Sequence, residues 1–314
     1  MSFTEPRLPP ELEREIFETT SELHPSMTPS LLRVSKRVLQ WIGPMVFRNI
    51  ILSDSEAYDL QLVQDALIRA AEQKSASFLA NGVRRLVLDE VFGLLPVSKG
   101  FGPAIQRCTG VTHLAVWEPD IDDLPDEVVR AIVRMPLRRL SSRLHRLLES
   151  DMSEDPAHFA SLPFLRNLTH LDIFEGELER LLLSLITTLP FLTHLAISFM
   201  PSPALFRRLL IECTKLESFV VLAMTTEYRS AIPDSFLYPL KDILDTFDVQ
   251  ARRDLRCDRF TIVNSVLWYE GVLPDVDADG QPGNFWARAQ EYIDEKRRGA
   301  ISDEDNSFWV TYPW

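Results

Sequence analysis

The sequence predicts an α/β protein: a repeat solenoid with a curved parallel sheet, preceded by a small all-helical motif. Two observations lead to this prediction. Short apolar segments typical of buried strands recur along residues 81–223, with helical periodicity between them. The first fifty residues instead show helical spacing and helix-start signals, proline and hydroxyl residues among them. The chain therefore divides into a helical N-terminal unit and a longer repetitive domain.

Two helices are expected within residues 1–52. Proline suits the start of the first helix, where a missing N–H costs nothing, and Leu12 and Ile16 lie four residues apart on its apolar stripe. The second helix is expected over residues 28–42, with a hydroxyl cap followed by proline at its start. A unit of this size is too small to bury all of its apolar side chains alone. It must therefore pack on the rest of the chain or on a partner.

The order of these patterns resembles the F-box motif, in the form common among fungal proteins. The matching first-helix residues are Leu8, Pro9, Glu11, Leu12, Ile16 and Phe17. The matching second-helix residues are Leu31, Leu32, Val34, Ser35 and Trp41. The linker SELHPSMTP departs from the family pattern because it lacks the usual second apolar cluster. The resemblance implies that the matching residues dock a Skp-type adaptor, which connects the chain to a cullin-RING ubiquitin ligase.

Six segments share an apolar-x-x-apolar-x-apolar template, which the third follows least well. They are residues 83–88, 111–116, 137–142, 168–173, 192–197 and 216–221. Their fourth positions are Leu86, Leu114, Leu140, Leu171, Leu195 and Phe219, at steps of 28, 26, 31, 24 and 24 residues. This spacing is close to the period of leucine-rich repeats, but the asparagine after the strand is missing. We therefore expect irregular leucine-rich repeats, in which the third segment fits a helical face equally well.

One side of the predicted strands offers a recognition surface. Side chains alternate along a strand, so the third and fifth template positions, and the residue after the template, should face the concave side. The expected target-binding residues are Arg85, His113, Trp117, Arg139, Arg143, His170, Asp172, Phe174 and His194. Small residues between them, such as Ala115 and Ala196, should leave room for a ligand chain. The alternative is that these polar side chains are simply solvated.

Two sets of residues resemble metal-binding sites. His170 and His194 should lie about 5 Å apart on adjacent strands, with Asp172 nearby, but a repeated THL phrase explains their register without a metal. DVDADG, residues 275–280, copies the first half of a calcium loop, yet Trp286 stands where the glutamate should be. A solvated Asp-Gly turn is the better interpretation. We expect no metal, and a metal-dependent hydrolase on the histidine row remains an alternative function.

Composition narrows the function classes further. The chain has 314 residues, 46% of them hydrophobic, and a net charge of −13 that repels phosphate backbones and anionic lipids. The most leucine-rich stretch, residues 178–192, is too short and too polar to span a bilayer. Three distant cysteines fit neither a disulfide framework nor a metal site. We expect a cytoplasmic or nuclear protein with reduced thiols and with neither nucleic acid nor a membrane as partner.

The sequence thus predicts four regions: 1–52, an F-box-like helical motif; 53–80, a connecting helix; 81–223, the repeats; and 224–314, a C-terminal cap. Additional strands are expected at FRNIIL and RFTIV, and Asn284 should cap a final helix over residues 285–298. We find no catalytic motif and expect no enzyme, catalytic residue or cofactor. The expected function is a substrate-receptor subunit of a cullin-RING ubiquitin ligase that binds an unknown protein target. A non-ligase interaction scaffold is the alternative.

Overall fold

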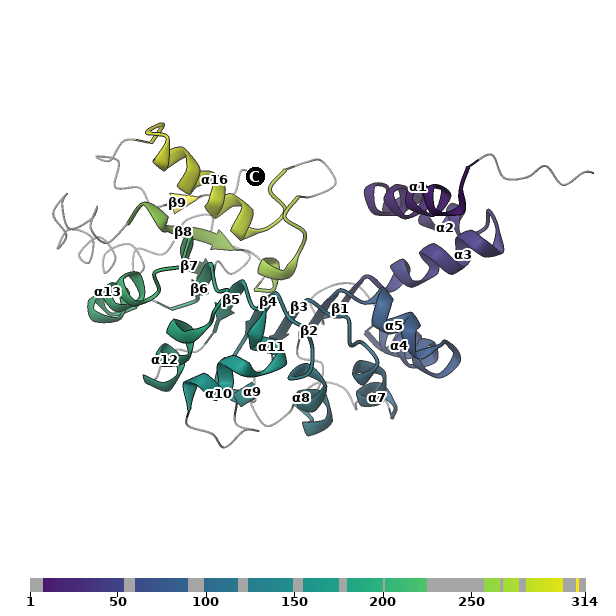
Figure 1. Ribbon diagram of the computed structural model, residues 1–314, viewed down its shortest axis with the longest axis horizontal. Coiled ribbons are helices and arrows are strands. Elements are labelled where there is room, and N and C mark those ends of the chain that lie inside the picture. Colours follow the sequence, from purple (N-terminus) through teal and green to yellow (C-terminus); the bar gives the residue numbers. More distant parts are fainter. Residues whose placement is uncertain are drawn as a thin grey trace, which may run out of the picture.

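The computed structural model arranges the chain around one parallel sheet (Figure 1). It describes residues 8–53, 60–89, 99–117, 124–148, 155–174, 180–199, 201–224, 257–265, 268–276, 281–301 and 309–310. Their strands form a nine-stranded sheet whose spatial order follows the sequence order. Each neighbouring pair is parallel, so every connection must cross back along a face of the sheet. The α/β class with a parallel sheet is confirmed.

The strands are short and lie in the predicted register. They are β1 (Asn49–Ser53), β2 (Arg85–Asp89), β3 (His113–Trp117), β4 (Arg139–Ser142), β5 (His170–Ile173), β6 (His194–Ile197), β7 (Ser218–Met224), β8 (Phe260–Ser265) and β9 (Trp309–Val310). Leu86 is paired with Leu114, and the fourth template position stays in line through to Phe219 on β7. The predicted alignment of the six segments is therefore confirmed. The two additional strands are present as β1 and β8.

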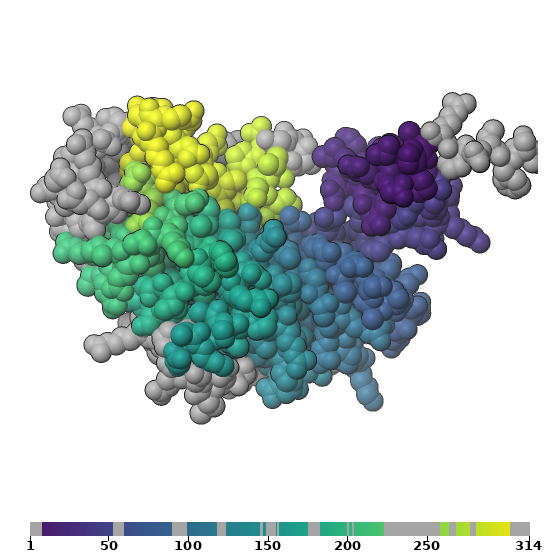
Figure 2. Space-filling model, viewed as in Figure 1, coloured from purple at the N-terminus to yellow at the C-terminus, as the bar shows by residue number. Residues whose placement is uncertain are grey.

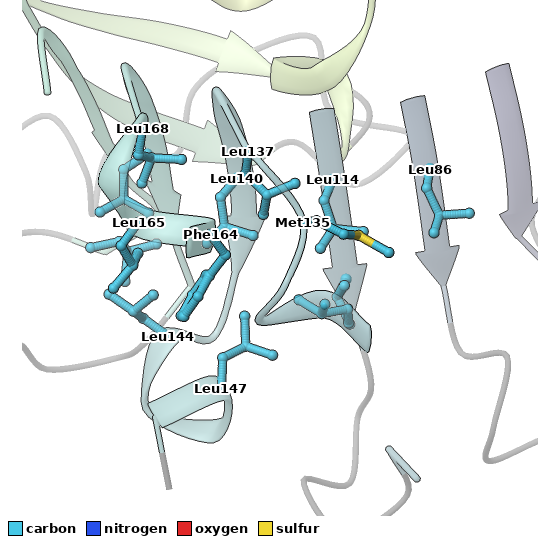
Figure 3. Packing of buried hydrophobic residues seen from close by; sticks show 14 of the residues in the cluster. Leu86, Leu114, Met135, Leu137, Leu140, Leu144, Leu147, Phe164, Leu165 and Leu168 are labelled. Carbon is cyan, nitrogen blue, oxygen red and sulfur yellow. The ribbon is translucent and has the colours of Figure 1, made fainter. Parts of the chain in front are cut away.

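Helices connect the strands along one face of the sheet, below it in Figure 1. They are α4 (Leu60–Gln73), α5 (Ala76–Gly82), α7 (Phe101–Gln106), α8 (Asp126–Ile132), α9 (Leu144–Leu148), α10 (Pro156–Ser161), α11 (Pro163–Arg166), α12 (Arg180–Thr188) and α13 (Pro203–Glu212). Strand leucines such as Leu86, Leu114 and Leu140 are at most 1% exposed under these helices. Figure 3 shows Leu140 beside Phe164 and Leu165 of α11, within one continuous core. Burying each such side chain stabilises the fold by about 1.5–3 kcal/mol.

The C-terminal part of the chain covers the opposite face, which we call the second face. We name residues 268–276 and 281–301 the C-terminal segment. It contains η5 (Glu270–Val272) and α16 (Phe285–Arg297), which lie above the sheet in Figure 1. Tyr269 and Val272 pack on Val87 and Ala115, and Phe285, Trp286 and Ala289 of α16 pack on four residues of β6 to β8. The packed strand residues are Ala196, Val220, Leu222 and Val263. The C-terminal residues therefore add strands at the end of the sheet and also fold back across it.

Residues 8–47 form the N-terminal helical unit, which projects from the β1 end of the sheet (Figure 1). It consists of α1 (Pro10–Leu23), η1 (Pro25–Met27), α2 (Thr28–Leu31), α3 (Lys36–Ile42) and η2 (Gly43–Phe47). Only its end is seen to pack on α5: the rings of Phe47 and Phe78 are 5.6 Å apart. At Gly82 an added Cβ would lie 2.6 Å from the Pro44 carbonyl oxygen, so this approach requires glycine.

Three expected elements are divided differently in the structure. The helix expected over residues 28–42 is wrong as one element: Ser35 is extended, with φ −161° and ψ 162°, and its side chain accepts a hydrogen bond from the Val38 N–H to start α3. The expected connecting helix is two helices, because Ser75 is extended between α4 and α5. In the third repeat the strand interpretation is confirmed, as β4; the single helical face through Leu137 and Leu140 is wrong, because helix α9 begins only at Leu144.

In the part of the chain that the structure describes, no helix has both the length and the apolar character needed to cross a membrane.

Cys108 and Cys213 are buried free thiols. Burial raises the pKa of Cys108 to about 12 and that of Cys213 to about 11, so both thiols stay protonated and unreactive.

Candidate functional site

The outer side of α1 carries a row of exposed apolar side chains. Leu8, Leu12 and Ile16, which we call the outer row, are 45%, 48% and 52% exposed. The four-residue spacing of Leu12 and Ile16 places them on one side of the helix, and Leu8 lies two residues before the helix begins. Five more exposed apolar residues of the unit are Leu23, Met27, Val34, Leu39 and Val46. These eight are two thirds of the large hydrophobic side chains that are exposed among the described residues, so most of such side chains gather on the N-terminal helical unit.

The inner side of α1 packs on α3 and leaves the outer row uncovered. The rings of Phe17 and Trp41 are 6.5 Å apart, with the Arg37 guanidinium 5.1 Å from the centre of the Trp41 ring. Arg37 also forms an ion pair with Glu13 across the two helices. Val38 is buried beneath them. The unit therefore holds its shape through these contacts and not through the outer row.

The structure brings the predicted adaptor-binding residues together on this unit. Those exposed to solvent are Leu8, Pro9, Glu11, Leu12, Ile16, Val34 and Ser35. Those half-buried are Phe17, Leu31, Leu32 and Trp41. Ser35 also has a structural role as the cap of α3. The whole set thus remains accessible at least in part, as a docking surface requires.

The predicted target-binding residues lie on the second face, where the C-terminal segment covers many of them. Arg139 is 9% exposed, and Asp172 is fully buried. Half-buried are Arg85, His113, Trp117, Arg143, His170, Phe174 and His194. Ala115 and Ala196, expected to leave room for a ligand chain, instead lie under η5 and α16. Much of the predicted recognition surface is therefore occupied by the chain itself.

Asp172 is an example of a predicted target-binding residue that the structure buries. Its carboxylate accepts a hydrogen bond from the Ser141 hydroxyl at 3.2 Å, and its other oxygen has no partner among the described residues. Burial raises the pKa of Asp172 well above its usual value, although the Ser141 hydrogen bond opposes this. Asp172 is thus a residue of the protein interior, and a target cannot reach it in this structure.

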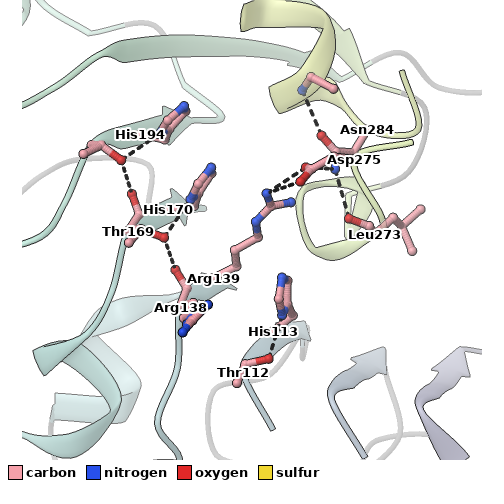
Figure 4. Close-up of polar contacts among 12 residues, drawn as sticks. Thr112, His113, Arg138, Arg139, Thr169, His170, His194, Leu273, Asp275 and Asn284 are labelled. Carbon is pink, nitrogen blue, oxygen red and sulfur yellow. Dashed lines mark hydrogen bonds and ion pairs between the residues drawn. The ribbon is translucent and has the colours of Figure 1, made fainter. Parts of the chain in front are cut away.

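The histidines of the THL repeats form a ladder across the sheet. Thr112, Thr169 and Thr193 each hydrogen-bond the Nδ1 of the next histidine at 2.8–2.9 Å (Figure 4). The hydroxyls of Thr169 and Thr193 also donate to the backbone carbonyls of Arg138 and Thr169, each of which directly precedes the neighbouring strand. These hydroxyls must therefore accept from the histidines, which assigns the proton to Nδ1.

Two of these imidazoles are stacked and capped by a tryptophan. The ring centres of His170 and His194 are 4.0 Å apart, and Trp286 meets them edge-on at 5.2 and 5.7 Å. Among the described residues, no group of three His, Cys, Asp or Glu side chains is placed to hold a metal ion. The geometry of this pair is that of packing between repeats.

Burial strongly affects the ionisation of the three histidines. It lowers the pKa of His113 to about 3, helped by the charges of Arg85 and Arg139, and that of His194 to about 4, helped by Arg139. Burial, with the neighbouring His194 and then Arg139, also lowers the pKa of His170. All three imidazoles are therefore neutral at pH 7 and resist protonation while the chain is folded.

We expect these histidines to make the fold sensitive to acid. An unfolded imidazole binds its proton near pH 6.5, whereas the folded ones do so only near pH 4 or below, so stability is complete above pH 6.5 and lost as pH falls from there. Urea unfolding at pH 7.5 and pH 5 should show a loss of about 2 kcal/mol per histidine. The loss should be smaller in His113→Gln, and an equal loss in that variant would contradict the assignment.

An ion pair ties the C-terminal segment to the second face. One Arg139 nitrogen lies 2.7 and 2.9 Å from the two carboxylate oxygens of Asp275 (Figure 4). The Asn284 amide donates to Asp275 and to the Leu273 carbonyl, both at 2.9 Å, while its oxygen caps α16 by accepting from the Ala287 N–H. Partial burial opposes ionisation of Asp275, but Asn284 and then Arg139 outweigh it and lower its pKa. Asp275 is thus an anchor, and not simply part of a solvated turn; the rest of that turn, residues 277–280, lies outside the described residues.

A second set of contacts lies at the other end of the strands. Trp117, Phe174 and Trp268 form a cluster with ring centres 5.6–6.1 Å apart. The Arg143 guanidinium lies 4.9 Å from the centre of the Trp117 ring. The predicted anchors Trp117 and Phe174 are thus brought together, but they pack on Trp268 of the C-terminal segment.

Sequence reasoning missed the residues that hold the C-terminal segment in place. Besides Asp275, they include the ion pair between Arg288 and Glu270, which is buried at 4% and 6% side-chain exposure. One signal was available: the predicted final helix had an apolar face with Trp286 at its start, and that face needed a surface to cover it.

Comparison with known proteins assigns no family to this chain. No protein-family model matches the chain, and no curated protein matches it significantly.

Proposed function

We propose that this chain is the substrate-receptor subunit of a cullin-RING ubiquitin ligase. In this proposal the N-terminal helical unit binds a Skp-type adaptor, and through it a cullin, while the repeat domain holds a protein target. The chain itself supplies proximity, and ubiquitin transfer is catalysed by the other subunits. Such a ligase would act in the cytoplasm or the nucleus.

The exposed outer row is the observation that carries the proposal. Leu12 and Ile16 are about half exposed although they belong to a well-packed helix pair. An apolar row on a projecting unit is stabilised when a partner covers it, because burial of apolar surface contributes about 25 cal/mol per Å². These two positions are also central to the F-box resemblance. The exposure of Leu12 and Ile16 and their place in the F-box resemblance therefore support the same side of α1 as the docking side.

The repeat domain supports the second half of the proposal. Six template segments in line on adjacent parallel strands, with helices on one face, are the arrangement expected of an irregular leucine-rich-repeat solenoid. We propose this description for the fold, with the second face as its concave side. Solenoids of this kind present extended surfaces to other proteins.

A non-ligase scaffold is the second candidate, and one observation favours it. η2 packs on α5 through Phe47 and Phe78, and β1 extends the sheet, so the unit also closes the end of the repeat domain. If the helices served only as that cap, the outer row would have no partner. The two candidates therefore differ in adaptor binding.

Co-expression with a Skp-type adaptor and a cullin tests the proposal. We expect the full chain to elute with both proteins in a single peak on size-exclusion chromatography, in equal amounts. The complex should lose the cullin when the adaptor is omitted, because the chain contacts the cullin through it. Elution of the chain alone in the presence of the adaptor would favour the scaffold.

A further inference from the structure

Exposure along the third template position changes from one end of the second face to the other. Asn49 on β1 is exposed, and Arg85 and His113 on β2 and β3 are half-buried. Arg139 on β4 and Ser218 on β7 are buried, at 9% and 0% exposure. Figure 2 shows the purple N-terminal helical unit standing to one side of the yellow and yellow-green C-terminal segment. His170 and His194 on β5 and β6 are half-buried as well, so Asn49 is the exposed member of this row. We call the β1 end of the second face, where Asn49 lies, the open end.

Three arginines meet at this open end, and one of them lacks an acidic partner. Arg48 pairs with Glu22, and Arg139 pairs with Asp275. Arg85 donates from Nη1 to the Asn49 side-chain oxygen at 3.1 Å, a neutral partner, and its Nε is buried without a hydrogen bond. Within the described ranges, no carboxylate forms an ion pair with Arg85.

The surroundings of Arg85 compensate its positive charge only in part. Burial, and then the nearby guanidiniums of Arg48 and Arg139, lower the pKa of Arg85, and the carboxylates of Asp275 and Glu22 oppose this shift without cancelling it. An arginine nevertheless stays protonated in proteins, so the charge persists in a partly desolvated position. The positive charge at this place contrasts with the net charge of the whole chain, which is −13. An anion bound at the guanidinium would relieve this repulsion.

Asn49 adds a second donor to the same place. Its side-chain oxygen accepts from Arg85, so its amide nitrogen is left to donate toward the open end. Val46 precedes β1 and Val276 follows Asp275, and they are 54% and 57% exposed.

We propose that the open end of the second face, centred on Arg85 and Asn49, binds an anionic side chain, carboxylate or phosphorylated, in an extended segment of a partner protein. The inference rests on the proposed function for the role of that partner, which would be the ligase target. The forked guanidinium of Arg85 suits paired hydrogen bonds to a carboxylate or phosphate.

Selection of displayed random peptides on the full chain tests this inference. We expect the selected peptides to share an acidic residue, and replacing it by glutamine should remove binding. Affinity should fall about tenfold or more in Arg85→Gln, because a hydrogen-bonded charge is lost, and should be partly retained in Arg85→Lys. Arg166→Gln, which changes an exposed arginine of α11, should bind as the wild type does. Phosphoserine in place of the acidic residue shows which anion binds more tightly.

Several results would overturn the inference: selected peptides without an acidic residue, equal binding by Arg85→Gln, or no enriched peptide. Thermal unfolding of each variant shows that the fold is kept. Adaptor binding is measured in parallel and should be unchanged in Arg85→Gln. Peptide binding without adaptor binding would contradict the proposed ligase function and leave this inference standing, so the two failures are distinguishable.

Discussion

Replacing both Leu12 and Ile16 by aspartate should abolish binding of a Skp-type adaptor. Both side chains are about half exposed, so the double variant should fold, at a cost of roughly 1 kcal/mol in helix propensity. In the complex, however, two carboxylates would occupy positions that the adaptor must desolvate. Interface anchors contribute about 2 kcal/mol or more each, so affinity should fall beyond detection by calorimetry.

A matched control separates this effect from a general change of surface charge. Leu62 on α4 and Ile211 on α13 are 59% and 55% exposed and also lie on helices, but outside the N-terminal helical unit. The double variant Leu62→Asp, Ile211→Asp should bind the adaptor as the wild type does. Undiminished affinity in the folded Leu12→Asp, Ile16→Asp variant, or equal loss in the control, would refute the assignment of the docking side.

Trp286→Ala should destabilise the protein by about 3–5 kcal/mol, the range for removing a large aromatic from a core. Trp286 is 2% exposed, meets the rings of His170 and His194 edge-on, and packs with Phe285 and Ala289 of α16. Its loss would leave a cavity between α16 and the second face. Urea unfolding at pH 7.5 measures the change.

The same variant should also raise the pKa of His194. With α16 loosened, water would reach His194, and its pKa should rise from about 4 toward the ordinary value. Proton titration followed by NMR would show this shift. Phe191→Ala provides a control, because that side chain is 57% exposed and its removal should have little effect on stability or titration. A Trp286→Ala protein with wild-type stability would mean that α16 does not depend on this contact.

The strand register could be predicted because it is encoded locally. Leu86, Leu114 and the equivalent residues repeat with the apolar spacing of a buried strand, and a register slip by one would turn every one of them away from the connecting helices. Alternation then fixed which side chains share a face. The same reasoning located β1 and β8, whose apolar runs pair at the two ends of the repeats.

The covering of the second face could not be predicted in the same way. The ion pair between Arg139 and Asp275 joins residues 136 positions apart, and no periodic pattern records such a contact. The aspartates around Asp275 suggested a solvated turn because that motif has a strong local preference. Sequence reasoning therefore predicted an exposed target surface with room above Ala115 and Ala196. In the structure the C-terminal segment packs on these two small residues.

The exposed apolar side of the N-terminal helical unit was within reach of sequence reasoning for a physical reason. A unit of that size has more apolar side chains than it can bury, so some of them must face outward. Which ones do so depended on tertiary contacts: Phe17 turns toward Trp41, whereas Leu12 and Ile16 do not. The cap formed by Ser35 was not foreseen, because the surrounding apolar spacing favoured one continuous helix.

Hydrogen exchange of the full chain, with and without a Skp-type adaptor, tests the central proposal most directly. Amide protection reports where a partner covers or stabilises the backbone. We expect added protection in α1 and α3 of the N-terminal helical unit, with no change in α16 or in β4 to β7. Absence of protection at saturating adaptor, or protection confined to the second face, would contradict the proposal that the outer row docks the adaptor.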